Sequence, residues 1–266
     1  MLAPSASPAP LVPAVVDAYL ARVGHGPVGA PSLAALASLQ DAHVRAVPFE
    51  NLDIHLGRAL SLDLAHLAAK VVADHRGGFC YELNGLFCAL LRTLGYDAWL
   101  VEARGLRDDG SLGARFDHAR ILVRVGADDP VLVDVGTGVS PRGPIRLEAT
   151  PQRIGDTWYR VTQAEGRYVS ERYEDGTWAR GWCFDTVPRM LEDFRDRCRH
   201  HEHSPESDFT GTPLCTLVTE DGHRTLSDRR LITCRGDTRE ERQIDDPLTV
   251  LHELFGIRLP RWPHAG

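Results

Sequence analysis

The sequence predicts an α+β fold in which helices come first, strands follow and a mixed segment ends the chain. Apolar residues recur at helical spacing as far as Gly95. From 99 to 135 they alternate with polar residues, which is the pattern of half-buried strands. Helical spacing returns over 248–255, just before Gly256. Helices followed by strands, without regular alternation of the two, favour α+β over α/β.

The composition is that of an ordinary globular protein. The chain has 266 residues, of which 43% are hydrophobic and 25% charged, so a sizeable core can form. A net charge of −7 without a Lys/Arg run argues against nucleic acid as a partner, and charges interrupt every apolar stretch, which argues against a membrane span. Residues 1–13 read as a disordered tail and not as a signal peptide, so we expect a cytoplasmic protein with reduced cysteines.

The first third of the chain is predicted to be helical. Ser32 and Ser61 are candidate N-caps for its second and third helices. The strongest helix follows a Gly-Gly pair and should end at Gly95. Its apolar stripe consists of Leu83, Leu86, Phe87, Leu90, Leu91 and Leu94. This stripe places Cys80 at the N-terminus of the helix.

Two of the predicted strands carry polar residues among apolar ones. Over 117–125, His118 and Arg120 share one face, and apolar residues take the other. Over 131–135 three valines share a face and Asp134 points away from them. Further short strands are expected near 158–161, 167–173, 214–219 and 230–233.

Cys80 is a candidate nucleophile. A helix N-terminus favours an anion, so this position is expected to lower the pKa of the thiol and populate the thiolate. Considered alone, a cysteine at a helix start is more often a small core residue. The case for chemistry therefore depends on its partners.

His118 and Asp134 are those partners. A carboxylate in an apolar strand is costly to bury unless another group pairs with it, and an imidazole is a natural partner. Asp134 would orient His118, and His118 would take the thiol proton. The order Cys, His, Asp resembles that of papain-type enzymes, in which the nucleophile also lies on a helix and its partners on strands. The spacing alone leaves protease, transglutaminase and acyltransferase open.

Several ordered motifs resemble those of the arylamine N-acetyltransferase family, which includes ansamycin-type amide synthases. They run from about residue 15 to 260. The matching stretches are Val47-Pro-Phe-Glu-Asn-Leu52, Arg76-Gly-Gly-Phe-Cys-Tyr-Glu82 with Asn84-Gly85, Asp117-His118, Val133-Asp134-Val135-Gly136, Ser204-Pro-Glu-Ser-Asp-Phe-Thr210 and Phe255-Gly256-Ile257.

The resemblance implies three parts around a papain/transglutaminase-like cysteine triad. A helical domain, 14–95, would hold the nucleophile Cys80. An antiparallel β-barrel domain, 96–195, would hold His118 and Asp134. An α/β lid domain, 196–266, would follow.

The resemblance also implies a ping-pong reaction. Acetyl-CoA, a cosubstrate and not a permanently bound cofactor, would acylate Cys80, and an aromatic amine, hydrazine or N-hydroxyarylamine would then take the acetyl group. Phe49 would form a wall of the acceptor pocket. The residues implied for contact with CoA are Gly136, Gly138, Thr210 and Thr212.

Thr137 departs from the family pattern, which usually has an aromatic residue after the glycine that follows the triad Asp. The smaller side chain should leave a wider and wetter acceptor pocket, or it is neutral variation in a loop. A wider pocket would suit an amide synthase that closes a polyketide macrolactam delivered by an acyl carrier protein. A papain- or transglutaminase-like hydrolase is a further alternative.

The cluster over 198–203, which contains one cysteine and three histidines, lacks a usual zinc spacing. We therefore expect that this segment binds no metal and is a solvated connector into the lid.

Overall fold

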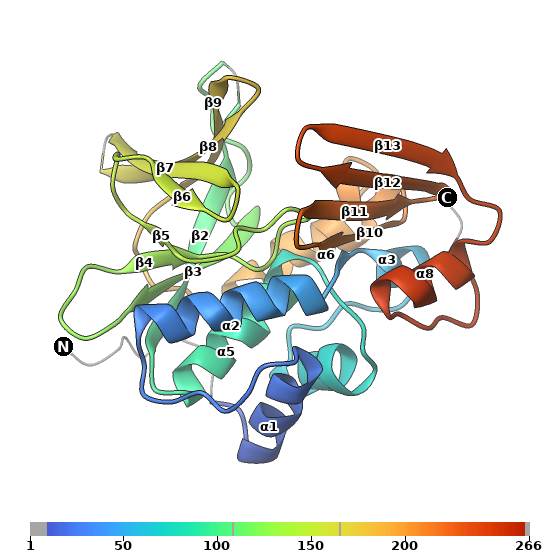
Figure 1. The fold of residues 1–266 in the computed structure, drawn as a ribbon, viewed down its shortest axis with the longest axis horizontal. Coiled ribbons are helices and arrows are strands. Elements are labelled where there is room, and N and C mark those ends of the chain that lie inside the picture. The colour runs from blue at the N-terminus through green and yellow to red at the C-terminus, as the bar shows by residue number, and fades with distance from the viewer. Residues whose placement is uncertain (1–9, 108, 165, 264–266) are drawn as a thin grey trace.

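The structure is a computed structural model that describes residues 10–107, 109–164 and 166–263. It consists of a helical first part, an eight-stranded antiparallel sheet and a five-stranded antiparallel sheet (Figure 1). The predicted mixture of helix and sheet is confirmed. Of the predicted tail, residues 1–9 lie outside the described part, while Leu11 is buried and its N–H donates to Thr93 Oγ1 at 2.7 Å.

The helical part begins with α1, Pro13–Arg22, and α2, Leu33–Ala46. Ser32 caps α2 as predicted, since its hydroxyl accepts from the Ala35 N–H at 3.1 Å. Short helices follow: α3, Leu52–His55, and α4, Leu64–Ala68, which continues as a π-helical turn over Ala69–Ala73. The predicted N-cap at Ser61 is wrong. Asp63 caps α4 instead, because its side chain stands next to the first helical residue and accepts from the His66 N–H at 2.9 Å.

Helix α5, Cys80–Thr93, is the centre of the helical part. It starts at the predicted cysteine, and Gly95, just past its end, has the positive φ of +91° that glycine adopts without strain. Every residue from Cys80 to Leu91 is buried. The apolar stripe on its own would bury one face, but strands and further helices also cover the others.

The eight-stranded sheet forms a nearly closed barrel. Its strands occur in the order β5-β4-β3-β2-β9-β8-β7-β6, and β5 also contacts β7. The bounds are β2, Asp97–Gly105; β3, His118–Arg124; β4, Val131–Val133; β5, Ile145–Arg146; β6, Gln152–Ile154; β7, Thr157–Ala164; β8, Arg167–Glu174; and β9, Thr177–Phe184.

The five-stranded sheet combines one strand from the helical part with four strands from the last part of the chain. Its first strand, β1, Phe49–Glu50, comes from the helical part and pairs with β10, Leu214–Val218. The order continues through β11, Gly222–Ser227, β12, Arg230–Arg235, and β13, Thr238–Gln243. The helices of this region are a 3₁₀ turn over Leu191–Phe194; α6, Arg195–His203; α7, Asp208–Gly211; and α8, Pro247–Phe255, which ends at Gly256 as predicted.

The two faces of β3 and β4 belong to different cores. Ala119 and Ile121 pack with α5 in the main core, as do Val131 and Val133. Leu122, in contrast, lies with other barrel residues in a second core inside the sheet. Figure 1 shows α5 beneath β2 and β3, in agreement with the contacts between these elements. The alternation predicted from sequence therefore decides which polar side chains of β3 and β4 face the barrel.

The buried pair of Tyr19 and His43 makes stability depend on pH. The Tyr19 hydroxyl lies 2.6 Å from His43 Nδ1, and burial, with the Arg22 charge adding to it, lowers the pKa of His43 to about 3. An unfolded imidazole has a pKa of about 6.5. As the pH falls below that value, only the unfolded chain takes up this proton, so the native state loses stability until the folded pKa is reached.

We expect this histidine to remove about 2 kcal/mol of unfolding free energy between pH 7.5 and pH 5. Urea unfolding at several pH values measures the effect. In the His43→Gln variant, the loss of unfolding free energy between these two pH values should be smaller by that amount. The His66→Gln variant, changed at an exposed site, should lose as much unfolding free energy as wild type. Equal slopes in wild type and His43→Gln would contradict the assignment.

Candidate active site

The thiol of Cys80 lies at the N-terminus of α5 and is only 2% exposed. Burial raises its pKa well above the usual value, and hydrogen bonds from the backbone N–H groups of Ala119 and Tyr81 act in the opposite direction without cancelling that effect. The lowered pKa predicted from the helix start is therefore wrong, because desolvation of the anion outweighs the helix terminus. Burial thus favours the thiol over the thiolate at this position.

A network of buried charges fixes the start of α5. Glu82 accepts the Phe79 N–H at 3.1 Å and the Lys70 ammonium at 2.7 Å. Lys70 also reaches Asp53 at 2.8 Å. Burial alone would lower the pKa of Lys70, but the neighbouring carboxylates raise it above its ordinary value. The lysine stays charged and ties the helix start to α3.

Arg76 and Glu50 form a second buried ion pair near the start of α5. Both are buried, with a guanidinium nitrogen 2.7 Å from the carboxylate. Glu50 Oε2 also accepts the Leu52 N–H at 2.8 Å. The pair links the segment before α5 to β1 and so has a structural role.

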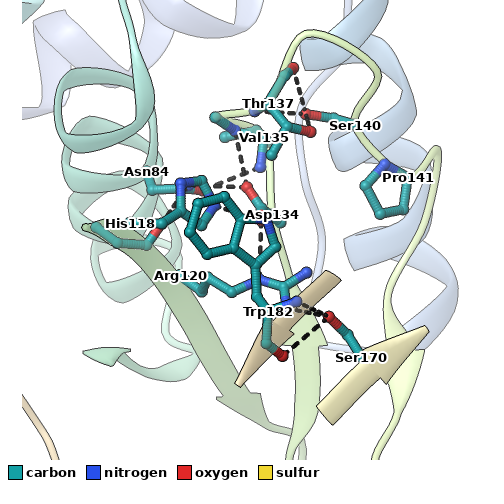
Figure 2. Close-up of polar contacts among 12 residues, drawn as sticks. Asn84, His118, Arg120, Asp134, Val135, Thr137, Ser140, Pro141, Ser170 and Trp182 are labelled. Carbon is teal, nitrogen blue, oxygen red and sulfur yellow. Dashed lines mark hydrogen bonds and ion pairs between the residues drawn. The ribbon is translucent and has the colours of Figure 1, made fainter. Parts of the chain in front are cut away.

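The carboxylate of Asp134 gathers four donors from three segments (Figure 2). Its Oδ2 accepts His118 Nε2 at 2.7 Å and Arg120 Nε at 2.9 Å. Its Oδ1 accepts Asn84 Nδ2 at 2.9 Å and the Gly136 N–H at 3.0 Å. Burial would raise the pKa of Asp134, but the charge of His118, then that of Arg120, holds it well below its usual range. The carboxylate is thus ionised at neutral pH.

Strand register brings these side chains together. Ile121 pairs with Val133, so the next pair along the same ladder sets Arg120 opposite Asp134, on the barrel face. The His118 ring stacks on Trp182, with ring centroids 4.5 Å apart and planes 22° apart. The ring is therefore held between a carboxylate and an indole.

The loop after β4 contacts the nucleophile directly. A methyl group added at Gly136 would lie 2.7 Å from Cys80 Cα and 2.5 Å from Asn84 Nδ2. Only glycine leaves room for this approach. Asn84 completes the connection, because its Oδ1 accepts the Val135 N–H at 2.9 Å. The loop that carries Asp134 is thereby fixed against the first turns of α5.

The predicted acceptor residues Phe49 and Thr137 border one hollow with Gly138, which in this structure is too narrow to hold a water molecule. Phe49 bridges to Gly78, two residues before Cys80, and Thr137 follows Gly136, so the hollow lies close to the nucleophile. The Thr137 hydroxyl lies 3.0 Å from Ser140 Oγ.

The predicted CoA residues divide into two groups. Gly136 and Gly138 belong to the loop beside Cys80, as described above. Thr210 and Thr212 lie at the end of α7, where the Thr210 hydroxyl already donates to the Ser204 carbonyl at 2.8 Å. The Thr212 carbonyl accepts Asn51 Nδ2 at 2.9 Å. Contact of any of these residues with CoA stays a prediction.

The cluster over 198–203 is not the solvated connector expected from its charges. It lies within α6, with Cys198 and His201 buried. His201 packs edge-on against Phe79, next to the nucleophile. Among residues 10–107, 109–164 and 166–263, no cluster of His, Cys, Asp and Glu has the arrangement of a metal site. Nor does any helix in that part of the chain have the length and apolarity needed to cross a membrane.

Three side chains at this site had no role assigned from sequence. Asn84 follows Cys80 by one helical turn, so i, i+4 spacing could have placed both on one face. Arg120 follows His118 by two residues on a strand, which gave a similar signal. Trp182 is brought in by the pairing of β9 with β2, for which the sequence held no indication.

A cavity of about 320 Å³ opens inside the barrel next to these residues. Its lining includes Arg120, Asp134, Thr137, Tyr159 and Trp182. Thr137, the residue predicted to widen the acceptor pocket, lies on the wall of this cavity, and the widening itself stays a prediction.

Comparison with known proteins agrees with this architecture. A family profile described as N-acetyltransferase matches residues 32–262. The arylamine N-acetyltransferase of Mycolicibacterium smegmatis is 34% identical over 91% of this chain and 91% of its own length. The solved structure of the Salmonella typhimurium enzyme superposes with a TM-score of 0.88 at 30% identity, covering 96% of each chain. A Mycobacterium marinum arylamine N-acetyltransferase solved in complex with CoA gives a TM-score of 0.84 at 31% identity, covering 91% of this chain and 92% of its own.

These relatives and the shared barrel define the chain as an acyltransferase. It belongs to the arylamine N-acetyltransferase family. Acetyl-CoA is the cosubstrate of this family, in keeping with the CoA complex among the solved relatives.

Gly136 and Gly138 offer a matched test of the contact with α5. Gly136→Ala should lower the unfolding free energy by about 1–3 kcal/mol and reduce acetyl transfer, because the new methyl group forces the loop away from Cys80. At Gly138 the nearest atoms to such a methyl group are those of Thr216 at 3.6 Å, an ordinary contact, so Gly138→Ala should be nearly neutral in stability. Urea unfolding and steady-state acetylation of an arylamine measure both. Equal effects of the two substitutions would refute the packing argument.

Proposed function

We propose that this chain transfers acetyl from acetyl-CoA to an arylamine through a thioester on Cys80, with His118 and Asp134 as the other members of the triad. The observation that carries the proposal is the Asp134 carboxylate, which binds His118 at 2.7 Å from a loop packed against Cys80. A carboxylate, an imidazole and a thiol at adjoining positions form the arrangement needed for nucleophilic acyl transfer.

In the first half-reaction, Cys80 Sγ attacks the thioester carbonyl of acetyl-CoA while His118 accepts the thiol proton. Because Nε2 of His118 is bonded to Asp134, Nδ1 is the nitrogen left to take that proton. The C–S bond to CoA then breaks, and CoA leaves with the proton returned by His118. Asp134 stabilises the imidazolium in between, which compensates for the raised pKa of the buried thiol.

In the second half-reaction, the amine nitrogen attacks the acetyl carbon on Cys80 and gives its proton to His118. The C–S bond breaks, the amide leaves and Cys80 regains its proton. Donor and acceptor would thus use the same thiol in turn, which makes the kinetics ping-pong.

For the acceptor, we propose aromatic amines, hydrazines and N-hydroxyarylamines. A curated Salmonella typhimurium protein, whose sequence aligns with 80% of this chain at 34% identity, is named as both an arylamine N-acetyltransferase and an N-hydroxyarylamine O-acetyltransferase. We assign Phe49 and Thr137 to the acceptor pocket because both lie near Cys80, Phe49 through its bridge to Gly78 and Thr137 next to Gly136. The barrel cavity at Thr137 favours acceptors bulkier than a single ring.

The two alternatives from sequence receive less support. The relatives described above carry arylamine N-acetyltransferase names, and no observation favours an acyl carrier protein as donor, so the amide synthase is not proposed. The papain- or transglutaminase-like hydrolase shares the triad but not the family match over 32–262.

Replacing the nucleophile tests the triad. Cys80→Ala should lower arylamine acetylation by at least about 10³-fold while the protein stays folded, since the variant lacks the thiol proposed to carry the acetyl group. Cys88→Ala, on the same buried helix, is the matched control and should keep activity within several-fold of wild type. Acetylation by the folded Cys80→Ala protein at a wild-type rate would show that the thiol is not the carrier.

A further inference from the structure

Arg120 occupies an unusual place beside the triad acid. It shares Asp134 Oδ2 with His118: its Nε lies 2.9 Å from that oxygen and His118 Nε2 lies 2.7 Å from it. The arginine is 4% exposed. A buried guanidinium is costly unless it is paired, so this pairing is a specific feature of the site.

A second contact fixes the guanidinium from across the barrel. Nη1 of Arg120 donates a hydrogen bond to Ser170 Oγ at 2.7 Å. Ser170 lies where the register of β8 against β9 shifts, between Val169 and Glu171. Such bulges re-aim a side chain, and here the serine points toward Arg120. Figure 2 shows the resulting chain from Asp134 through Arg120 to Ser170.

We propose that Arg120 is a positioning residue that makes the triad acid half of a neutral ion pair and thereby sets the pH at which Cys80 becomes reactive. This inference rests on the proposed function of Cys80. Arg120 also lines the barrel cavity, but its effect on Cys80 is exerted through Asp134, with which it forms an ion pair.

The physical effect has a definite sign. A buried positive charge near a group of titratable residues makes every proton of that group easier to remove. Without Arg120, Asp134 would present a full negative charge to His118, and the coupled site would hold its protons to higher pH. Asp134 would also lose one of the two charges that keep its pKa depressed.

Other ionisable groups around the pair come from several elements. Cys80 on α5 and His118 on β3 face Asp134, and the phenol of Tyr159 on β7, whose pKa is raised by burial, lies near Arg120. Glu171 and Arg172 on β8 line the same cavity. Within the described residues, Arg120 is the cation in direct contact with the Asp134 carboxylate besides the imidazole.

The experiment follows alkylation of Cys80 by iodoacetamide as a function of pH, read by peptide mass spectrometry so that other thiols do not contribute. Arg120→Met keeps most of the side-chain volume beside the cavity and removes the charge. We expect the midpoint of the pH–rate profile to move up by about one pH unit. Arg120→Lys, which restores a cation, should return the midpoint to near the wild-type value.

Arg124→Met is the matched control. It lies on the same strand and removes an ion pair with Asp97 at 3.0 Å, away from the triad. Its midpoint should equal that of wild type. If Arg120→Met fails to fold, Arg120→Gln, which keeps a donor for Asp134, carries the same expected shift.

An unmoved midpoint in the folded Met or Gln variant would overturn the proposal, and so would a Lys variant shifted as far as the Met variant. The alkylation assay needs no acetyl-CoA. If the acyl-transfer function itself is wrong, wild type fails to form an acetyl adduct, whereas the comparison of alkylation profiles still stands.

Discussion

The buried carboxylate of Asp134 is the constraint on which the rest of the site depends. Its four donors come from the helical part, from the barrel strand β3 and from its own loop, so one charged group joins the two main bodies of the fold. A buried carboxylate with fewer partners would protonate or expel its strand into water. The same contacts that make its burial tolerable fix Asn84 on α5, and with it the position of Cys80 relative to His118.

Burial has opposite consequences for the two ends of the triad. The charges of His118 and Arg120 lower the pKa of Asp134, whereas burial raises the pKa of the Cys80 thiol. In the proposed mechanism, the resting protein therefore holds a protonated thiol, and His118 removes the proton when an acyl donor is present. This arrangement protects the nucleophile from adventitious oxidation, which attacks thiolates preferentially.

Periodicity and caps predicted the elements that carry the site. The stripe along α5 and Gly95 placed Cys80 correctly, and strand alternation put Asp134 on the face away from its valines. Pairings between distant strands cannot be inferred from local sequence patterns. These patterns therefore predicted neither the contribution of Trp182 nor the pairing of β1 with β10. The pKa of Cys80 was predicted in the wrong direction, because a helix start is visible in sequence and the depth of burial is not.

The central claim is that Cys80 carries the acetyl group between donor and acceptor. The most direct measurement is peptide mass spectrometry of the protein mixed with acetyl-CoA alone, followed by addition of an arylamine. The account predicts a single acetyl adduct on Cys80 that disappears as an equal amount of acetylated amine forms. Acetylated amine that appears only when donor and acceptor are present together, with Cys80 unmodified throughout, would contradict it.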